Sequence, residues 1–140
     1  MKIQILAVGK MRDRHMAALC DDYVQRARRH VPIEIVEVDD DAALARRLPA
    51  RGELIALEPG GEAWTTEELA KHLERQMLHG AHTIAFLIGG ALGLPKGVVG
   101  RASRRLSLSN LTLPHRLARV VLCEQLYRAM SIIRGEPYHH

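Results

Sequence analysis

The chain has little of what marks secreted, metal-binding or membrane-embedded proteins. Its 140 residues include two cysteines, and Cys20 and Cys123 match neither a C-x-x-C pair nor a zinc-ligand spacing. No apolar stretch approaches a membrane span, and the opening "MKIQILAVGK" is too short for a signal peptide. We therefore expect one cytoplasmic domain over residues 1–140 with buried thiols, no metal and no membrane partner.

Aromatic residues and lysines are also scarce. Trp64 and Phe86 are the only residues of their types, which argues against a base-stacking platform for single-stranded nucleic acid. Four of the 20 basic residues are lysines, and the formal net charge is +4. Because arginine pairs bidentately with phosphate, the excess of arginine favours a nucleic-acid partner. Genome base content, or a solvated helix face at residues 26–30, explains the excess equally well.

The stretch "HTIAFLIGGALGLPKG", residues 82–97, joins an apolar strand to a glycine-rich turn that lacks both common nucleotide motifs. No three glycines have the i, i+2, i+5 spacing of a dinucleotide site, and Lys96 is followed by Gly97 rather than by the Ser or Thr of a P-loop. Two interpretations remain. The glycines let a ligand approach the backbone, or they only turn the chain after a central strand.

Hydrophobic periodicity predicts an α/β fold. The expected strands are residues 2–8, 32–38, 53–58 and 83–88, with 107–113 a short fifth strand or a loop, and the expected shorter helices are 16–27, 39–48, 65–79 and 95–106. Strand 83–88 is apolar on both faces, which is typical of a central strand covered by helices. Alternating strands and helices predict a mostly parallel sheet with helices on both faces.

The longest predicted helix covers residues 114–134 and ends at Gly135. It carries two adjacent apolar stripes beside a polar strip that includes Arg116, Arg119, Glu124 and Arg128. So wide an apolar surface indicates either a contact with a partner subunit or deep burial.

Three loops follow strands of the predicted sheet, at residues 58–61, 89–97 and 109–115. Ligands of open parallel sheets bind at the carboxyl ends of the strands. These loops are therefore the expected binding site.

The segments "MKIQILAVGK", "LIGGALGLP" and "LSLSNLTLPHRLARVVLCEQLYRAMSIIRGEPYHH" resemble the ribosomal RNA large subunit methyltransferase H family of the SPOUT class. The likeness covers nearly the whole chain. It implies a C-terminal trefoil knot, a rare exception to unknotted topology, and a homodimer that binds S-adenosyl-L-methionine. It also implies methylation of N3 of a pseudouridine in helix 69 of 23S rRNA, on the assembled ribosome and not on DNA.

The resemblance also implies the site residues. The cofactor contacts are Leu57, Gly89, Leu108, Ser109, Asn110, Leu111, Thr112 and Leu113. The catalytic candidates are His115, Arg128, Tyr138 and His139. We expect His115 to stay neutral, because a helix N-terminus lowers the pKa of a histidine.

The sequence departs from the family pattern at a shorter segment near residues 39–52 and at Met130, where an aromatic residue often stands. Candidate RNA contacts are Arg12, Arg14, Arg101, Arg104 and Arg105, which flank the strand-end loops. The alternative to an enzyme is a non-catalytic ribosome- or RNA-binding protein that retains the knotted fold.

Overall fold

A five-stranded sheet forms the centre of the computed structural model, which describes residues 1–140. The strands lie in the order β2-β1-β4-β3-β5, and every neighbouring pair is parallel. The elements are β1 (Lys2–Val8), α1 (Arg14–Ala27), β2 (Ile33–Val38), α2 (Asp41–Arg47), β3 (Glu53–Glu62), α3 (Thr66–Leu78), β4 (Thr83–Ile88), α4 (Lys96–Val99), β5 (Arg104–Leu106) and α5 (His115–Ile133). The central position of residues 83–88 is confirmed.

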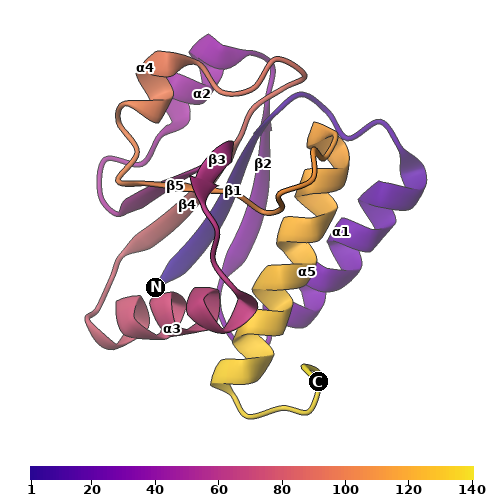
Figure 1. Cartoon of the computed structure of the whole chain (residues 1–140), viewed down its shortest axis with the longest axis vertical. Helices are drawn as coiled ribbons and strands as arrows, with labels where there is room; N and C mark the ends of the chain where they lie inside the picture. The colour runs from indigo at the N-terminus through magenta and orange to yellow at the C-terminus, as the bar shows by residue number, and fades with distance from the viewer.

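Helices cover both faces of the sheet, as predicted (Figure 1). On one face α5 packs against α1 and α3, and its buried side chains join the larger hydrophobic cluster, which contains Ile3, Phe86 and Leu126. On the other face α2 and α4 contribute Leu44 and Val98 to a smaller cluster. No helix has the length and apolar character that crossing a membrane requires.

Local sequence accounts for where the main helices begin. The side chains of Asp13 and Asp40 accept hydrogen bonds from backbone N–H groups at the starts of α1 and α2. Thr65 and Glu68 form a capping box at the start of α3. Each of these helices therefore begins at a side chain that accepts from its first backbone N–H groups.

Strand β3 continues past its predicted end. Leu57 and Glu62 both pair with Leu106, so the four residues between them bulge out of the strand. A Cβ atom on Gly61 would lie 2.8 Å from the backbone carbon of Arg105, and only glycine permits this approach. The predicted turn at residues 59–61 is thus a bulge within an extended strand.

The predicted helix over residues 95–106 is wrong. Helix α4 ends at Val99, and Arg104–Leu106 form β5 at the edge of the sheet. Residues 107–113, predicted as a fifth strand or a loop, are a loop. Gly97 and Gly100 weaken a longer helix, and pairing with β3 gives the next residues a strand conformation.

Candidate functional site

Three loops at the carboxyl edge of the sheet enclose a cavity of about 790 Å³. The first is the bulge of β3 at residues 58–61, the other two follow β4 and β5, and the first turn of α5 closes the wall. The volume suits a drug-sized or nucleoside-sized ligand, since such pockets measure about 300–1,000 Å³. All the predicted cofactor contacts line this one cavity: Leu57, Gly89, Leu108, Ser109, Asn110, Leu111, Thr112 and Leu113.

Gly89 fixes the shape of the loop after β4. A Cβ atom at this position would lie 2.3 Å from the backbone carbon of Gly93 and 2.5 Å from the backbone nitrogen of Leu94. The loop therefore folds tightly on itself, and Gly93 donates a backbone hydrogen bond to Gly90. Glycine is required here by the loop's own backbone, whatever ligand the cavity takes.

The lining carries little charge. Glu58 is its only carboxylate, and no lysine or arginine lines the cavity. Arg105 Nε donates to Glu58 Oε2 at 2.7 Å, which leaves the other carboxylate oxygen able to accept from a hydroxyl or amine of a ligand. Without a cationic cradle, the cavity suits a nucleoside better than a polyphosphate.

The mouth of the cavity is apolar. Leu92 on one loop is fully exposed, at 101%, and Leu111 on another loop is 78% exposed. The hydroxyl of Ser109 accepts from the backbone N–H of Leu111 and so holds the second loop in a turn. Exposed leucines at a cavity rim favour contact with a ligand or a partner.

His115, the first residue of α5, also lines the cavity. Its pKa lies below the ordinary value, first because the ring is partly buried and then because Arg116 and Arg119 repel the charged form. The direction agrees with the prediction, although burial, rather than the helix N-terminus, is the leading cause. Its Nδ1 atom is buried without a hydrogen-bond partner.

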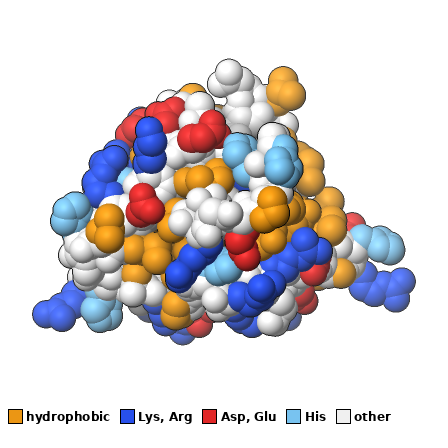
Figure 2. All heavy atoms as spheres, turned by 90° about the horizontal axis from the view of Figure 1, so that it is seen from below, with side chains coloured by type: hydrophobic (Ala, Val, Ile, Leu, Met, Phe, Trp, Pro, Cys, Tyr) orange, Lys and Arg blue, Asp and Glu red, His pale blue; other side chains and the backbone are white.

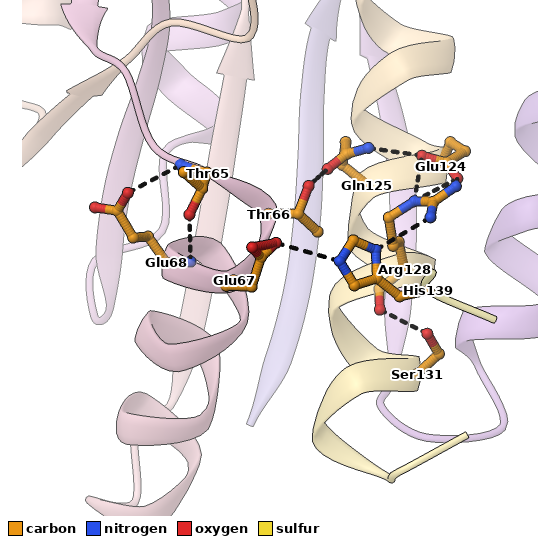
Figure 3. A network of polar contacts seen from close by, with 9 residues as sticks. All are labelled: Thr65, Thr66, Glu67, Glu68, Glu124, Gln125, Arg128, Ser131 and His139. Atoms are coloured by element: carbon orange, nitrogen blue, oxygen red, sulfur yellow. Dashed lines mark hydrogen bonds and ion pairs between the residues drawn. The ribbon is translucent and has the colours of Figure 1, made fainter. Parts of the chain in front are cut away.

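The other three catalytic candidates lie at the far end of α5. Arg128 Nη2 and the hydroxyl of Tyr138 both donate to Glu124 Oε2, at 2.8 Å and 2.7 Å. His139 Nδ1 lies 3.2 Å from Arg128 Nη1, and its Nε2 lies 3.2 Å from a carboxylate oxygen of Glu67 on α3. Figure 3 shows how the tail residue His139 reaches between the two helices. We call Glu124, Arg128, Tyr138 and His139 the tail cluster.

Charge partners set the pKa values in the tail cluster. Burial alone would raise the pKa of Glu124, but hydrogen bonds from Arg128 and Tyr138 outweigh it and lower the pKa. Burial and the bond to Glu124 raise the pKa of Tyr138. Tyr138 is therefore a protonated donor at neutral pH and not a base.

One chain does not bring all four catalytic candidates together. Arg128 lies thirteen positions after His115 on one continuous helix, which is about 20 Å at a rise of about 1.5 Å per residue. His115 lies at the cavity, whereas the tail cluster lies where the strands begin (Figure 1).

The sequence did not indicate a buried ion pair behind the cavity. Arg119, predicted in the polar strip of α5, is 2% exposed and pairs with Glu37 on β2. Its Nη2 also donates to the Gly9 carbonyl at 3.0 Å, and Glu37 accepts from the backbone N–H of Met11 at 2.8 Å. These bonds join α5 to the loop after β1.

Fold and site together define an α/β protein with a small-molecule pocket at the carboxyl edge of a parallel sheet. The chain belongs to the SPOUT methyltransferase family, since the family model described as "Predicted SPOUT methyltransferase" matches residues 1–139.

Named relatives match the chain over almost its whole length. A protein of Sorangium cellulosum named "Ribosomal RNA large subunit methyltransferase H" is 46% identical and aligns over 100% of both chains. A protein of Rubrobacter xylanophilus with the same name is 44% identical over 96% of both.

Solved structures share the fold at low sequence identity. A probable methylase family protein from Haemophilus influenzae superimposes with a TM-score of 0.59 at 11% identity, over 99% of this chain and 70% of that one. A structure described as "Structural insights into the 2-OH methylation of C/U34 on tRNA" superimposes with a TM-score of 0.53 at 17% identity, over 94% of this chain and 92% of that one.

Proposed function

We propose that the protein uses S-adenosyl-L-methionine to methylate N3 of a pseudouridine in helix 69 of 23S rRNA, in the cytoplasm and on the assembled ribosome. The names of the relatives support large-subunit rRNA as the substrate class, and the resemblance at the sequence level supplies the base and its position. The observation that carries the proposal is the cavity without lysine or arginine that is lined by every predicted cofactor contact.

When bound, the donor would supply a methyl group on a sulfonium: the target nitrogen would bond to the methyl carbon as the carbon–sulfur bond breaks and the neutral thioether leaves. The backbone of residues 108–113 and of Gly89 would hold the adenosine part, and Glu58 would accept from a ribose hydroxyl. Catalysis then consists largely of positioning, because in-line displacement needs the two reactants at near-attack distance. The lining residues exclude water from the methyl group.

The ring N–H of the target must lose its proton before N3 attacks. His115 is the candidate base at the cavity, because its lowered pKa keeps the ring neutral at pH 7. Arg128 and Tyr138 are donors and suit stabilisation of the negative charge on the deprotonated ring. Among the four catalytic candidates, His139 is the other imidazole besides His115.

We further propose a homodimer in which the tail cluster of one subunit completes the cavity of the other. The separation of the two sets of candidates along α5 supports this arrangement. Leu19 on α1 and Leu117 on α5 are large apolar side chains left 46% and 36% exposed, as expected of a face that a second subunit covers. We also propose that the C-terminal part of the chain forms the trefoil knot that the resemblance implies. A crystallographic trace of residues 83–140 tests this.

Two measurements test the proposed activity. Tritiated S-adenosyl-L-methionine is incubated with the protein and with ribosomes that lack the modification, and we expect label in 23S rRNA at one nucleotide. Calorimetry separates the enzyme from a non-catalytic RNA-binding protein. We expect the cofactor to bind with micromolar-class affinity, whereas no heat of binding would favour the non-catalytic alternative.

A further inference from the structure

We infer that the loop joining β1 to α1, together with the first turn of α5, binds RNA phosphates beside the cavity. This phosphate-binding loop consists of Lys10, Arg12, Arg14 and Arg116. The inference rests on the proposed function, because it assigns a surface to the RNA substrate. It reaches beyond the cofactor pocket and the tail cluster, and it selects Arg12 and Arg14 from the arginines that the sequence suggested as RNA contacts.

The loop lies next to the cavity. Arg116 directly follows His115, which lines the cavity, and Arg116 Nε donates to the Lys10 carbonyl at 3.3 Å. A Cβ atom on Gly90, another lining residue, would lie 3.6 Å from the side chain of Val8 at the end of β1. Phosphates bound here would therefore flank a base placed in the cavity.

The cations of the loop form no ion pair with a carboxylate, although the charge of Arg116 reaches the Asp13 carboxyl group. None of Lys10, Arg12, Arg14 and Arg116 forms an ion pair, and the first three are exposed. By contrast, Arg104 pairs with Glu53 and Glu62, and Arg105 pairs with Glu58. The structure therefore separates the predicted RNA-binding arginines into paired and unpaired groups.

Two nearby carboxylates are otherwise engaged. Asp13 accepts two backbone hydrogen bonds at the start of α1, and Glu37 pairs with Arg119. The acidic run at residues 39–41 leads into α2 on the opposite face of the sheet, where Asp40 caps that helix. The end of the molecule where the strands begin, seen from below in Figure 2, instead carries side chains of both signs close together.

The loop is held in one conformation. The buried guanidinium of Arg119 binds the Gly9 carbonyl, and Glu37 binds the Met11 N–H. Arg12 has a φ of 62°, in the left-handed region that a non-glycine residue rarely adopts. Strained backbone held by buried contacts is common at binding sites, because preorganisation reduces the cost of ordering on binding.

The chemistry of the loop selects the backbone of a folded RNA. Arginine and lysine without aromatic neighbours bind phosphate and leave bases unread. All three tyrosines of the chain lie elsewhere, since Tyr23, Tyr127 and Tyr138 pack together beside α1 and the tail.

The test compares two double variants. Arg12→Gln with Arg14→Gln removes two cations of the loop, and Arg29→Gln with Arg51→Gln removes two exposed cations near the opposite edge of the sheet. For the loop variant we expect the KM for ribosomes to rise about 10-fold, with kcat and cofactor affinity unchanged. The slope of log affinity for ribosomes against log salt should fall by about two, since each phosphate contact contributes about one.

Other outcomes have separate meanings. Equal KM values and salt slopes in the two double variants would overturn the inference. If the loop variant loses cofactor affinity, Lys10→Gln repeats the test on a residue that lies outside both helices. A wild-type protein that binds ribosomes with the expected salt slope but transfers no methyl group would refute the proposed function alone.

Discussion

Gly89 has no room for even one methyl group, because the backbone of Gly93 and Leu94 occupies the position of a Cβ atom. We predict that Gly89→Ala opens the loop and lowers cofactor affinity at least about 10-fold, equivalent to about 1.4 kcal/mol. Calorimetry with S-adenosyl-L-methionine measures the loss. Gly97→Ala is the matched control: nothing lies within 4 Å of its Cβ position, and alanine favours its helix. Equal affinity in both variants would contradict the assignment.

Arg119 offers a prediction about stability rather than binding. Arg119→Leu leaves Glu37 without its cation and the Gly9 carbonyl without its donor. We expect the free energy of unfolding to fall by about 3 kcal/mol, because breaking a buried ion pair leaves an uncompensated charge. Urea denaturation measures the change. Arg29→Leu, at an exposed position, should change it by less than about 0.5 kcal/mol.

At the scale of residues, the cavity was predictable and the buried ion pair was not. Leu57 lies near the predicted end of its strand, and Gly89 and residues 108–113 follow strands, so the rule for parallel sheets combined with the family motif predicted that they meet at one edge, where they line one cavity. Arg119 lies on a helix at a position that periodicity treats as polar. Its partner Glu37 is 82 positions away in the sequence, so no local pattern indicated the burial.

At the scale of elements, strands of the sheet centre were predictable because their apolar patterns are intrinsic to the segments. Strand β5 was not. "RRL" at residues 104–106 has no strand pattern of its own, and it becomes a strand by pairing with β3 and burying Leu106. The extension of β3 to Glu62 has the same origin, since Pro59, Gly60 and Gly61 locally favour a turn.

Helix α5 and its tail give a prediction about pH. The pKa of Glu124 is lowered in the folded protein, so its contribution to stability is complete above the unfolded value near 4.5 and is lost as the pH falls through the folded value. At pH 7 we expect Glu124→Gln to be less stable than wild type by about 1–2 kcal/mol. The difference should shrink steadily below about pH 4.5.

Thermal unfolding between pH 3 and pH 7 checks this expectation. Glu74→Gln is the control, because Glu74 is exposed and unpaired. A difference between wild type and Glu124→Gln that stays constant over the whole range would show that the ion pair with Arg128 does not contribute.

At the scale of the whole molecule, the length of α5 predicts complementation between subunits. We combine one subunit carrying Gly89→Ala, which lacks the pocket, with another carrying Arg128→Ala and His139→Ala, which lacks the tail cluster. If each site takes its pocket and its tail from different subunits, every mixed dimer has one intact site. An equal mixture should then recover about a quarter of wild-type methyl transfer, since about half of the dimers are mixed.

The mixture must be refolded or co-expressed so that subunits exchange, and analytical ultracentrifugation checks that the species is a dimer. Each variant alone should be nearly inactive. A mixed sample that is no more active than its components would place the complete site within one subunit and contradict the proposed arrangement.

Trp64 provides an optical signal from the segment that follows the cavity-lining bulge of β3. It is the only tryptophan of the chain, it follows the end of β3 by two residues, and the centre of its ring lies 5.4 Å from the Arg104 guanidinium and 4.9 Å from the centre of the His72 ring. A ligand that displaces residues 58–61 changes the surroundings of this indole. Intrinsic fluorescence can therefore follow pocket filling in real time without any attached dye, and the emission comes from one known place.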